Sequence, residues 1–266
     1  MGRCHTTSFE RGQDLSGLSV ALKEILEEFV RRQAQPAPAT FDVAADNCWA
    51  LRITCNTTSL PGLCIRSLED GDGPLLQLFS AKLGPVSKDL FSPYPWNDPS
   101  ALSGAFRKAI QNSREQVDAA YLIESAQHGV IGHFFLWKAG GNPHSHPFQI
   151  EVPELGVAIA DSFQGKGLGR LSVRILQAVA RELRSDAIEL TTAYDNEAGW
   201  KAYRACGFTY TGDINTPLGV DVTTVLSGKV HAAEYRSERQ MVYVINEEKR
   251  ERVLSYLAEK RRHAPG

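Results

Sequence analysis

A glycine-rich turn between a short apolar segment and an amphipathic segment is the part of this chain best suited to chemistry. Leu155, Val157 and Ile159 alternate as in a strand, and the turn Gln164-Gly165-Lys166-Gly167-Leu168-Gly169 follows shortly after. Helical periodicity begins at Leu168, so the turn opens on the N-terminus of a helix. Unpaired backbone N–H groups and the positive end of the helix dipole favour an anion there. The pattern predicts a pyrophosphate site.

Other phosphate-binding motifs fit this turn less well. No Gly-Lys-Ser/Thr ends the turn, which excludes a Walker loop. A dinucleotide fingerprint starting at Gly167 has Ser172 in place of its third glycine, with Glu189 near the position of a ribose-binding acid. However, Glu189 falls inside a predicted strand, and the upstream chain lacks repeated strand-helix-strand units. An NAD(P)-dependent oxidoreductase is therefore a minor alternative.

The sequence after the helix extends the pattern. A predicted strand at 188–193 is followed by Asn196, a short helix containing Tyr203, and then Gly207-Phe208. Gln-x-x-Gly-x-Gly after a strand resembles motif A of the GNAT superfamily of acyl-CoA N-acyltransferases, and the order Asn, Tyr, Gly-Phe resembles its motif B. The resemblance implies an α/β fold with a mixed, mostly antiparallel sheet flanked by helices. It also implies acetyl transfer from acetyl-CoA to a primary amine of a small molecule, peptide or protein.

The resemblance also implies where acetyl-CoA binds. Backbone N–H groups of the turn would hold the pyrophosphate, the preceding strand would flank the pantetheine arm, and an asparagine would hydrogen-bond the cofactor. The residues assigned in this way are Val157, Ile159, Gln164, Gly165, Lys166, Gly167, Leu168, Gly169 and Asn196. A non-catalytic acyl-CoA-binding module on the same scaffold is the first alternative, because a fold does not fix a function.

Two residues are predicted to be catalytic. Tyr203 matches the family's proton donor to the departing thiolate; a phenol of pKa about 10 is protonated at neutral pH, and a thiolate of pKa roughly 8.5 can take its proton. The alternative is a tyrosine packed on the sheet. Glu154 resembles the acidic residue at the start of the cofactor strand, which acts as the base. Glu151 and Asp195 are the other candidates for the base. The alternative interpretation of each of these residues is an exposed carboxylate without a catalytic role.

The loop around Phe91, Tyr94 and Trp96 is expected to border the acceptor. Tyr94-Pro95-Trp96 resembles a loop of ribosomal-protein N-terminal acetyltransferases, and aromatic residues that anchor a proline-stiffened loop are the alternative interpretation. His144-x-His146 lies in a Gly/Pro-rich loop without a Cys or carboxylate at ligand spacing, so we expect no metal.

Composition sets further bounds. The chain of 266 residues is 42% hydrophobic and 23% charged, as is typical of globular proteins. With 29 basic and 31 acidic residues, its net charge of −2 gives no indication of nucleic-acid binding. No apolar run approaches the roughly 20 residues that span a bilayer, and the first residues lack a hydrophobic signal region, so we expect no membrane association and a cytoplasmic location.

We expect three parts along the chain. Residues 1–62 form an N-terminal extension with an amphipathic helix, 63–246 form the acetyltransferase domain, and 247–266 form a C-terminal surface helix and tail. The N-terminal helix is expected to pack on the domain, and a homodimer contact is the second interpretation of its apolar stripe. An insertion at 213–238 is expected to fold over the acceptor entrance.

Overall fold

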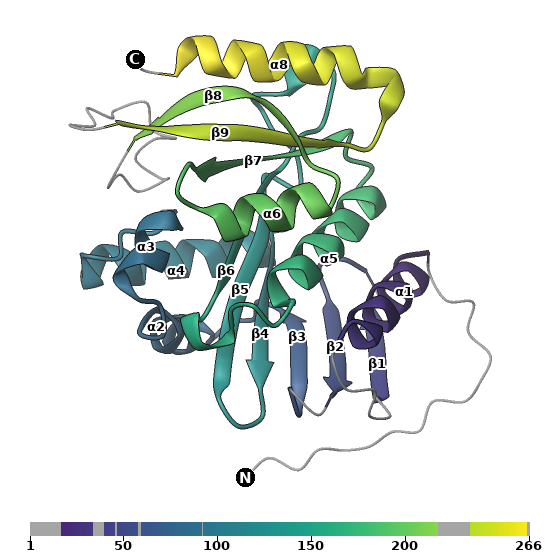
Figure 1. Ribbon diagram of the computed structural model, residues 1–266, viewed down its shortest axis with the longest axis vertical. Helices are drawn as coiled ribbons and strands as arrows, with labels where there is room; N and C mark the ends of the chain where they lie inside the picture. The colour runs from purple at the N-terminus through teal and green to yellow at the C-terminus, as the bar shows by residue number, and fades with distance from the viewer. Residues whose placement is uncertain are drawn as a thin grey trace.

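In the part of the chain that the structure describes, nine strands form one sheet in the order β1-β2-β3-β4-β5-β6-β7-β9-β8 (Figure 1). The computed structural model describes residues 17–33, 40–45, 47–57, 60–91, 93–217 and 235–264. The strands are β1 (Thr40–Ala45), β2 (Leu51–Asn56), β3 (Leu63–Ser67), β4 (Ala119–Ser125), β5 (Gly129–Trp137), β6 (Glu154–Ile159), β7 (Ala187–Ala193), β8 (Thr209–Pro217) and β9 (Tyr235–Val244). All neighbours pair antiparallel except β6 and β7, which are parallel. The predicted mixed, mostly antiparallel sheet is confirmed.

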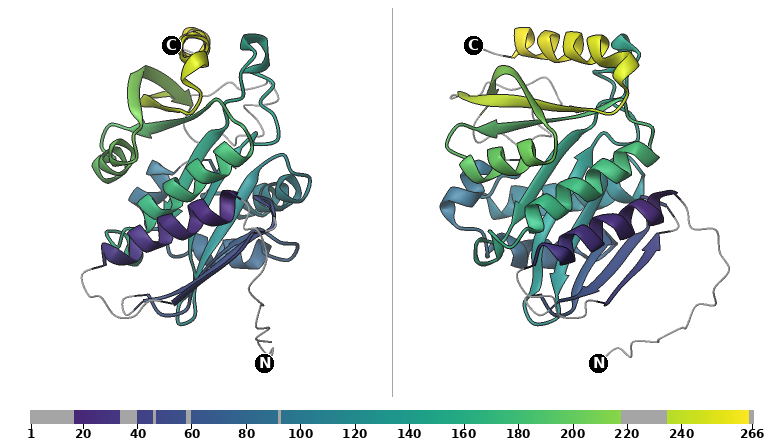
Figure 2. Two further views of the ribbon diagram at one scale, coloured as in Figure 1. Left: turned by 90° about the vertical axis from the view of Figure 1, so that its right-hand side faces the viewer. Right: turned by 45° about the vertical axis from the view of Figure 1, so that its right-hand side comes forward.

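Helices cover both faces of this sheet. They are α1 (Gly17–Arg31), α2 (Gly73–Ser80), α3 (Pro85–Leu90), α4 (Pro99–Arg114), α5 (Leu168–Glu182), α6 (Glu197–Ala205) and α8 (Arg250–His263), with short 3-10 turns η1 (His146–Phe148), η2 (Asp161–Phe163) and η3 (Glu247–Lys249). Figure 2 shows α1 and α5 on one face and α2 and α4 on the other. None of the described helices is both long and apolar enough to cross a bilayer.

The apolar stripes visible in the sequence explain how the helices pack. Leu171, Ile175 and Val179 of α5 are buried against the sheet. Leu22 and Leu26 of α1 are fully buried, and α1 packs along α5. The N-terminal helix therefore contacts the same chain through its apolar stripe.

Strands β6 and β7 separate shortly after they meet. Within the described residues, their only paired position is Glu154 opposite Glu189. After Glu154, β6 pairs with β5 alone among the described strands. The β5–β6 pairing runs from Glu154 opposite Trp137 to Ile159 opposite Gly132. The edge of β6 that faces β7 is thus open over most of its length, and its backbone amides and carbonyls are available to a ligand.

The structure differs from the sequence expectations in three segments. Residues 40–45 and 51–56 add β1 and β2 to the main sheet, where the sequence had predicted only an extension. Residues 213–217 and 235–238 continue β8 and β9, so the insertion expected at 213–238 is shorter; residues 218–234 lie outside the described residues. Helix α8 is not simply a surface helix, because its Val253, Tyr256 and Leu257 are buried against Val152 and Val242.

Candidate active site

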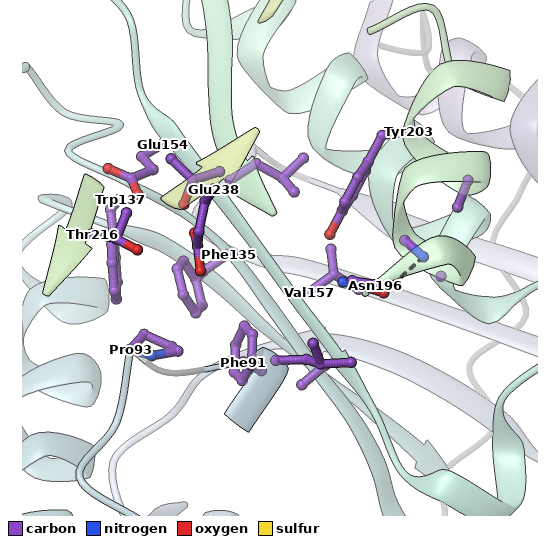
Figure 3. Close-up of a pocket in the computed structure, with 18 of the residues that line it drawn as sticks. Phe91, Pro93, Phe135, Trp137, Glu154, Val157, Asn196, Tyr203, Thr216 and Glu238 are labelled. Carbon is purple, nitrogen blue, oxygen red and sulfur yellow. Dashed lines mark hydrogen bonds between the residues drawn. The ribbon is translucent and has the colours of Figure 1, made fainter. Parts of the chain in front are cut away.

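A cavity of about 1500 Å³ lies along the opening between β6 and β7. The glycine turn and α6 line one part of it, whereas α3, β8, β9 and the C-terminal end of α8 line the other. Figure 3 shows Tyr203, Asn196 and Val157 together on one side, and Glu154, Glu238, Thr216 and Trp137 together on the other. The cavity therefore has two chemically distinct ends joined at the separated strands.

The glycine turn has the backbone geometry that its sequence predicted. Gly165 and Gly167 have φ angles of +74° and +83°, which favour glycine, and Gly167 is the N-cap of α5. Gln164, Gly165, Gly167 and Gly169 line the cavity. The side chain of Gln164 donates to the Ile159 carbonyl at 3.1 Å, so it shapes the turn.

Two predicted residues of this turn have other surroundings. The Leu168 side chain is buried in the core, and the Lys166 ammonium lies 4.7 Å from the centre of the Phe163 ring. Helix α1 and the residues just after it also lie against the turn: a Cβ at Gly167 would be 3.4 Å from Phe29 Cε2, and Gln33 Nε2 donates to the Lys166 carbonyl at 3.3 Å. The N-terminal helix therefore supports the candidate anion site.

Strand β6 and Asn196 border the middle of the cavity. Val157 and Ile159 both line it. A Cβ at Gly156 would lie 2.3 Å from Cζ of Phe135, so a glycine is needed for this ring to pack against the strand. Asn196 caps α6 by accepting from the Gly199 amide at 2.9 Å, and it also lines the cavity.

Tyr203 lines the cavity from α6. Figure 3 shows its hydroxyl pointing toward Val157 of β6. Burial, followed by the nearby Cys206 and the Glu238 carboxylate, raises the pKa of Tyr203 to about 12. The phenol is therefore protonated throughout the neutral range, as a proton donor must be.

Glu154 belongs to a charged cluster where β6 and β7 meet. Lys260 of α8 lies 3.3 Å from Glu154 Oε2 and 3.0 Å from Glu189 Oε2, and the Tyr256 hydroxyl donates to Glu189 Oε1 at 2.7 Å. Burial raises the pKa of Glu154, but the attraction of Lys260 and then of Lys138 outweighs this effect and lowers the pKa overall. The ion pair makes Glu154 a weaker base than an unpaired carboxylate.

A further carboxylate, Glu238 of β9, lines the cavity and is only 6% exposed. Its Oε1 accepts from Arg236 Nε at 3.0 Å and from Nη2 at 2.7 Å. Arg236 also bonds Asp89 of α3, with 2.8 Å between Nη1 and Oδ2. These residues link β9 to α3 at the end of the cavity away from α6.

Aromatic rings form the apolar wall at this end. The Phe135 and Trp137 rings stack with centroids 4.5 Å apart, and Phe91 lies 6.0 Å from Phe135. All three residues line the cavity, whereas Tyr94 and Trp96 do not. The Tyr94 hydroxyl bonds Nε2 of buried His133 at 2.8 Å, and Trp96 Nε1 donates to the Phe91 carbonyl at 2.6 Å. Tyr94 and Trp96 thus hold the loop that presents Phe91.

Burial lowers the pKa of His133 to about 4, so this ring is neutral at pH 7. His146 is 2.9 Å from Glu151 at the other side of its loop. Among the described residues, no three His, Cys, Asp or Glu side chains gather as metal ligands.

Comparison with known sequences decides the family. Residues 62–209 match the acetyltransferase (GNAT) domain. The chain belongs to the GNAT acetyltransferase family. The match covers more than half of the chain, and it confirms the predictions of a GNAT fold and of an N-acetyltransferase. No curated protein matches the chain.

Solved structures show the same fold at low identity. Ribosomal-protein-S5-alanine acetyltransferase from Vibrio fischeri aligns with a TM-score of 0.53 at 13% identity, over 70% of this chain and 93% of that chain. Spermidine N-acetyltransferase from Vibrio cholerae, in complex with CoA and spermine, aligns with a TM-score of 0.50 at 21% identity, over 68% and 95%. The yncA protein from Salmonella typhimurium, with its cofactor acetyl-CoA, aligns with a TM-score of 0.51 at 17% identity, over 70% and 95%.

Most of the residues predicted to form the site border one cavity. Two further residues of this cavity, Glu238 and Lys260, were not predicted as site residues. Glu238 stands on β9 and Lys260 on α8, both after the end of the matched region. Neither belongs to a motif. The one available signal for Glu238 was its position at the end of the insertion expected at 213–238.

Proposed function

We propose that this GNAT enzyme transfers the acetyl group of acetyl-CoA to a primary amine. One observation carries the proposal: the glycine turn at the N-terminus of α5 and the open edge of β6 border the same cavity as Tyr203. This arrangement offers an anion site, an unpaired strand edge and a protonated phenol in one continuous space. A long molecule with a pyrophosphate, two amides and a thioester has groups that match each of these features.

The chain's own residues suit the binding of that cofactor. Backbone N–H groups from Gly165 to Gly169 would hold the pyrophosphate, aided by the positive end of the α5 dipole. The amides of β6 around Val157 would pair with the pantetheine arm, which is how an unpaired strand edge binds an extended ligand. Asn196 borders this path, although its side chain already caps α6.

The reaction requires a neutral amine, a new C–N bond and a broken C–S bond. The amine nitrogen attacks the thioester carbonyl carbon, and the tetrahedral intermediate then releases the thiolate. We propose that Tyr203 gives its proton to this thiolate and that a cavity carboxylate takes the proton of the amine. Removing that proton at pH 7 costs about 4.6 kcal/mol for a lysine-like amine and about 1 kcal/mol for an α-amine. The sequence predicted Glu154 as this carboxylate, but its pairing with Lys260 weakens it as a base, and Glu238 is the other carboxylate at the same end of the cavity.

The names of two structural neighbours suggest which classes of amine acceptor to test first. The alanine of a ribosomal protein and spermidine are the acceptors in the names of two structural neighbours. Both an N-terminal amine and a small-molecule amine are therefore acceptor classes for a first screen.

The test combines cofactor binding with turnover. A thermal-shift titration with acetyl-CoA, CoA and NAD(P) should show stabilisation by the two coenzyme A forms, because a ligand that binds only the folded state raises its stability. Gly167→Asp should remove this shift by placing a carboxylate and a strained side chain in the turn. Gly104→Asp is the matched control, since a Cβ there meets nothing within 4 Å.

Thiol release from acetyl-CoA should then depend on an added amine. Stabilisation without amine-dependent thiol release across peptide and small-molecule amines would favour the non-catalytic binding module. Stabilisation by NAD(P) alone would overturn the proposal.

A further inference from the structure

Glu238 is a cavity carboxylate with one free oxygen at the end of the cavity away from α6. Both hydrogen bonds of its side chain to described residues use Oε1, which Arg236 holds through Nε and Nη2. Among the described residues, no group bonds Oε2. Since Glu238 lines the cavity at 6% exposure, a charged oxygen is held at the edge of a mostly enclosed space. A cation that enters this space would gain from pairing with it.

Arg236 orients the Glu238 carboxylate but does not cancel all of the negative charge around it. The guanidinium also bonds Asp89, through Nη1 to Oδ2 at 2.8 Å and through Nη2 to the Asp89 carbonyl at 3.1 Å. One positive charge thus serves two carboxylates, which leaves a net negative charge in this group. The planar guanidinium fixes the carboxylate direction better than a flexible ammonium would.

The other carboxylates at this end are held differently. Asp118 accepts from the Lys138 amide at 2.8 Å and from Asn112 at 2.6 Å, one bond on each oxygen. Among the described residues, Glu154 has one polar contact, from Oε2 to Lys260 at 3.3 Å. Glu238 is therefore better placed than Asp118 to receive an additional donor, and it is oriented more firmly than Glu154, because a planar guanidinium holds it through two bonds.

Side chains on opposite faces of β9 indicate the side from which the acceptor amine would approach the thioester. Arg239 stacks its guanidinium 4.7 Å from the Trp200 ring of α6, so the neighbouring Glu238 points to the opposite face of the strand. The glycine turn and α6 are thus on one side of the opening between β6 and β7, and Glu238 is on the other. An acceptor held by Glu238 would meet the thioester from the side opposite the cofactor.

We propose that Glu238 binds the ammonium of the acceptor and takes its proton, and that the acceptor is an amine with an apolar or aromatic body. The Trp137 and Phe135 rings next to Glu238 would cover that body, and a ring face attracts a cation. This inference rests on the proposed acetyl transfer. One proton moves from the ammonium to the Glu238 carboxylate, and the freed lone pair forms the C–N bond. The C–S bond then breaks as Tyr203 protonates the thiolate, and the second proton, which the nitrogen loses as the amide forms, restores the Tyr203 phenol.

The first experiment measures acetylation of 2-phenylethylamine by the full chain and by Glu238→Gln. The variant keeps the side-chain shape but loses the charge, so KM for the amine should rise about 10- to 100-fold, as for loss of a charged hydrogen bond, and kcat should fall. The Kd for CoA should not change. Glu247→Gln is the matched control, because Glu247 is also held by an arginine, Arg250, through 2.6 and 2.7 Å contacts, but on the exposed surface.

A second experiment does not depend on turnover. Benzyltrimethylammonium cannot be acetylated and has no N–H to donate, so it tests the charge alone; it should bind the CoA-loaded chain about 10-fold or more tightly than it binds CoA-loaded Glu238→Gln. Benzyl alcohol, which is neutral, should bind both equally. Glu238→Asp, which keeps the charge on a shorter side chain, should recover part of the affinity.

The outcomes separate the two proposals. If Glu238→Gln binds the cation as the natural chain does and acetylates 2-phenylethylamine with an unchanged KM, Glu238 has no role in acceptor binding, while acetyl transfer stands. If the cation binds through Glu238 but no amine is ever acetylated, the proposed function fails and the cation site remains.

Discussion

The Tyr203 hydroxyl points toward Val157 on the α6 side of the cavity, and it has no hydrogen-bond partner among the described residues. Its raised pKa, about 12, follows mainly from burial, with smaller contributions from Cys206 and Glu238. A phenol in this state keeps its proton at neutral pH, so a proton is present when the thiolate leaves, although the raised pKa makes the transfer less favourable than it is from a free phenol. These properties suit a proton donor better than a base.

We expect Tyr203→Phe to lower kcat by about 10²- to 10⁴-fold, the usual contribution of a general acid, while the Kd for CoA changes little. Steady-state kinetics at saturating acetyl-CoA would measure kcat, and calorimetric titration would measure the Kd. Tyr210→Phe is the control, because Tyr210 is 49% exposed and its hydroxyl bonds Asp213. A Tyr203→Phe enzyme with lower melting temperature but normal kcat would show that the ring only packs.

Among the elements, helix α8 does more than cover the sheet. Its Lys260 pairs with two carboxylates that the parallel pairing of β6 and β7 brings side by side, Glu154 and Glu189. Glu189 is 1% exposed, so its charge needs this partner. Docking of α8 thus supports the point at which the two strands separate.

We expect Lys260→Met to destabilise the fold by about 3 kcal/mol at pH 7, because it leaves two adjacent carboxylates without a cation. The pKa of Glu154 is lowered in the folded state, so its contribution is present above the unfolded pKa and is lost as pH falls through the folded pKa. The difference between natural chain and variant should therefore be largest above about pH 5 and should shrink as the pH falls below 4.5, through the lowered folded pKa of Glu154. Urea unfolding at neutral pH and at a pH well below 4.5 would measure it.

Lys201→Met provides the control for this prediction. Lys201 pairs with Glu197 at 3.2 Å, but the two side chains are 73% and 77% exposed, and such pairs contribute at most about 1 kcal/mol. Equal effects of the two substitutions, or a Lys260→Met effect that does not depend on pH, would contradict this account of α8.

The same elements show what the sequence predicted and what it did not. The glycine turn, the α5 stripe and the Asn-Tyr-Gly-Phe order are local patterns, so the fold family and the cofactor end of the cavity were predictable. Strand β2 also carried a signal, since Leu51, Ile53 and Cys55 alternate with exposed residues, but no motif drew attention to it. The acceptor end depends on β9 lying between β7 and β8 and on α8 folding back, and no local pattern specifies such contacts.

Across the whole molecule, the sheet consists of two parts with a weak connection. Strands β1 to β6 form one continuous antiparallel part, β7, β9 and β8 form the other, and β6 and β7 share one paired position within the described residues. A cofactor in the opening would contact β6 on one part and α6 on the other. Binding should therefore stiffen the junction as well as stabilise the fold.

We expect CoA at about 100 times its Kd to add about 2.7 kcal/mol to the stability of the chain. For a protein of this size, that corresponds to a rise in melting temperature of about 5–10 °C. Hydrogen exchange should slow at β6 and at α6 together, because a single ligand bridges them, and should change little at β1 and β2, which lie at the far edge of the sheet. Gly167→Asp should abolish both effects. Slower exchange confined to one side of the opening would mean that the cofactor does not lie between β6 and β7, and the whole arrangement proposed for acetyl transfer would then be wrong.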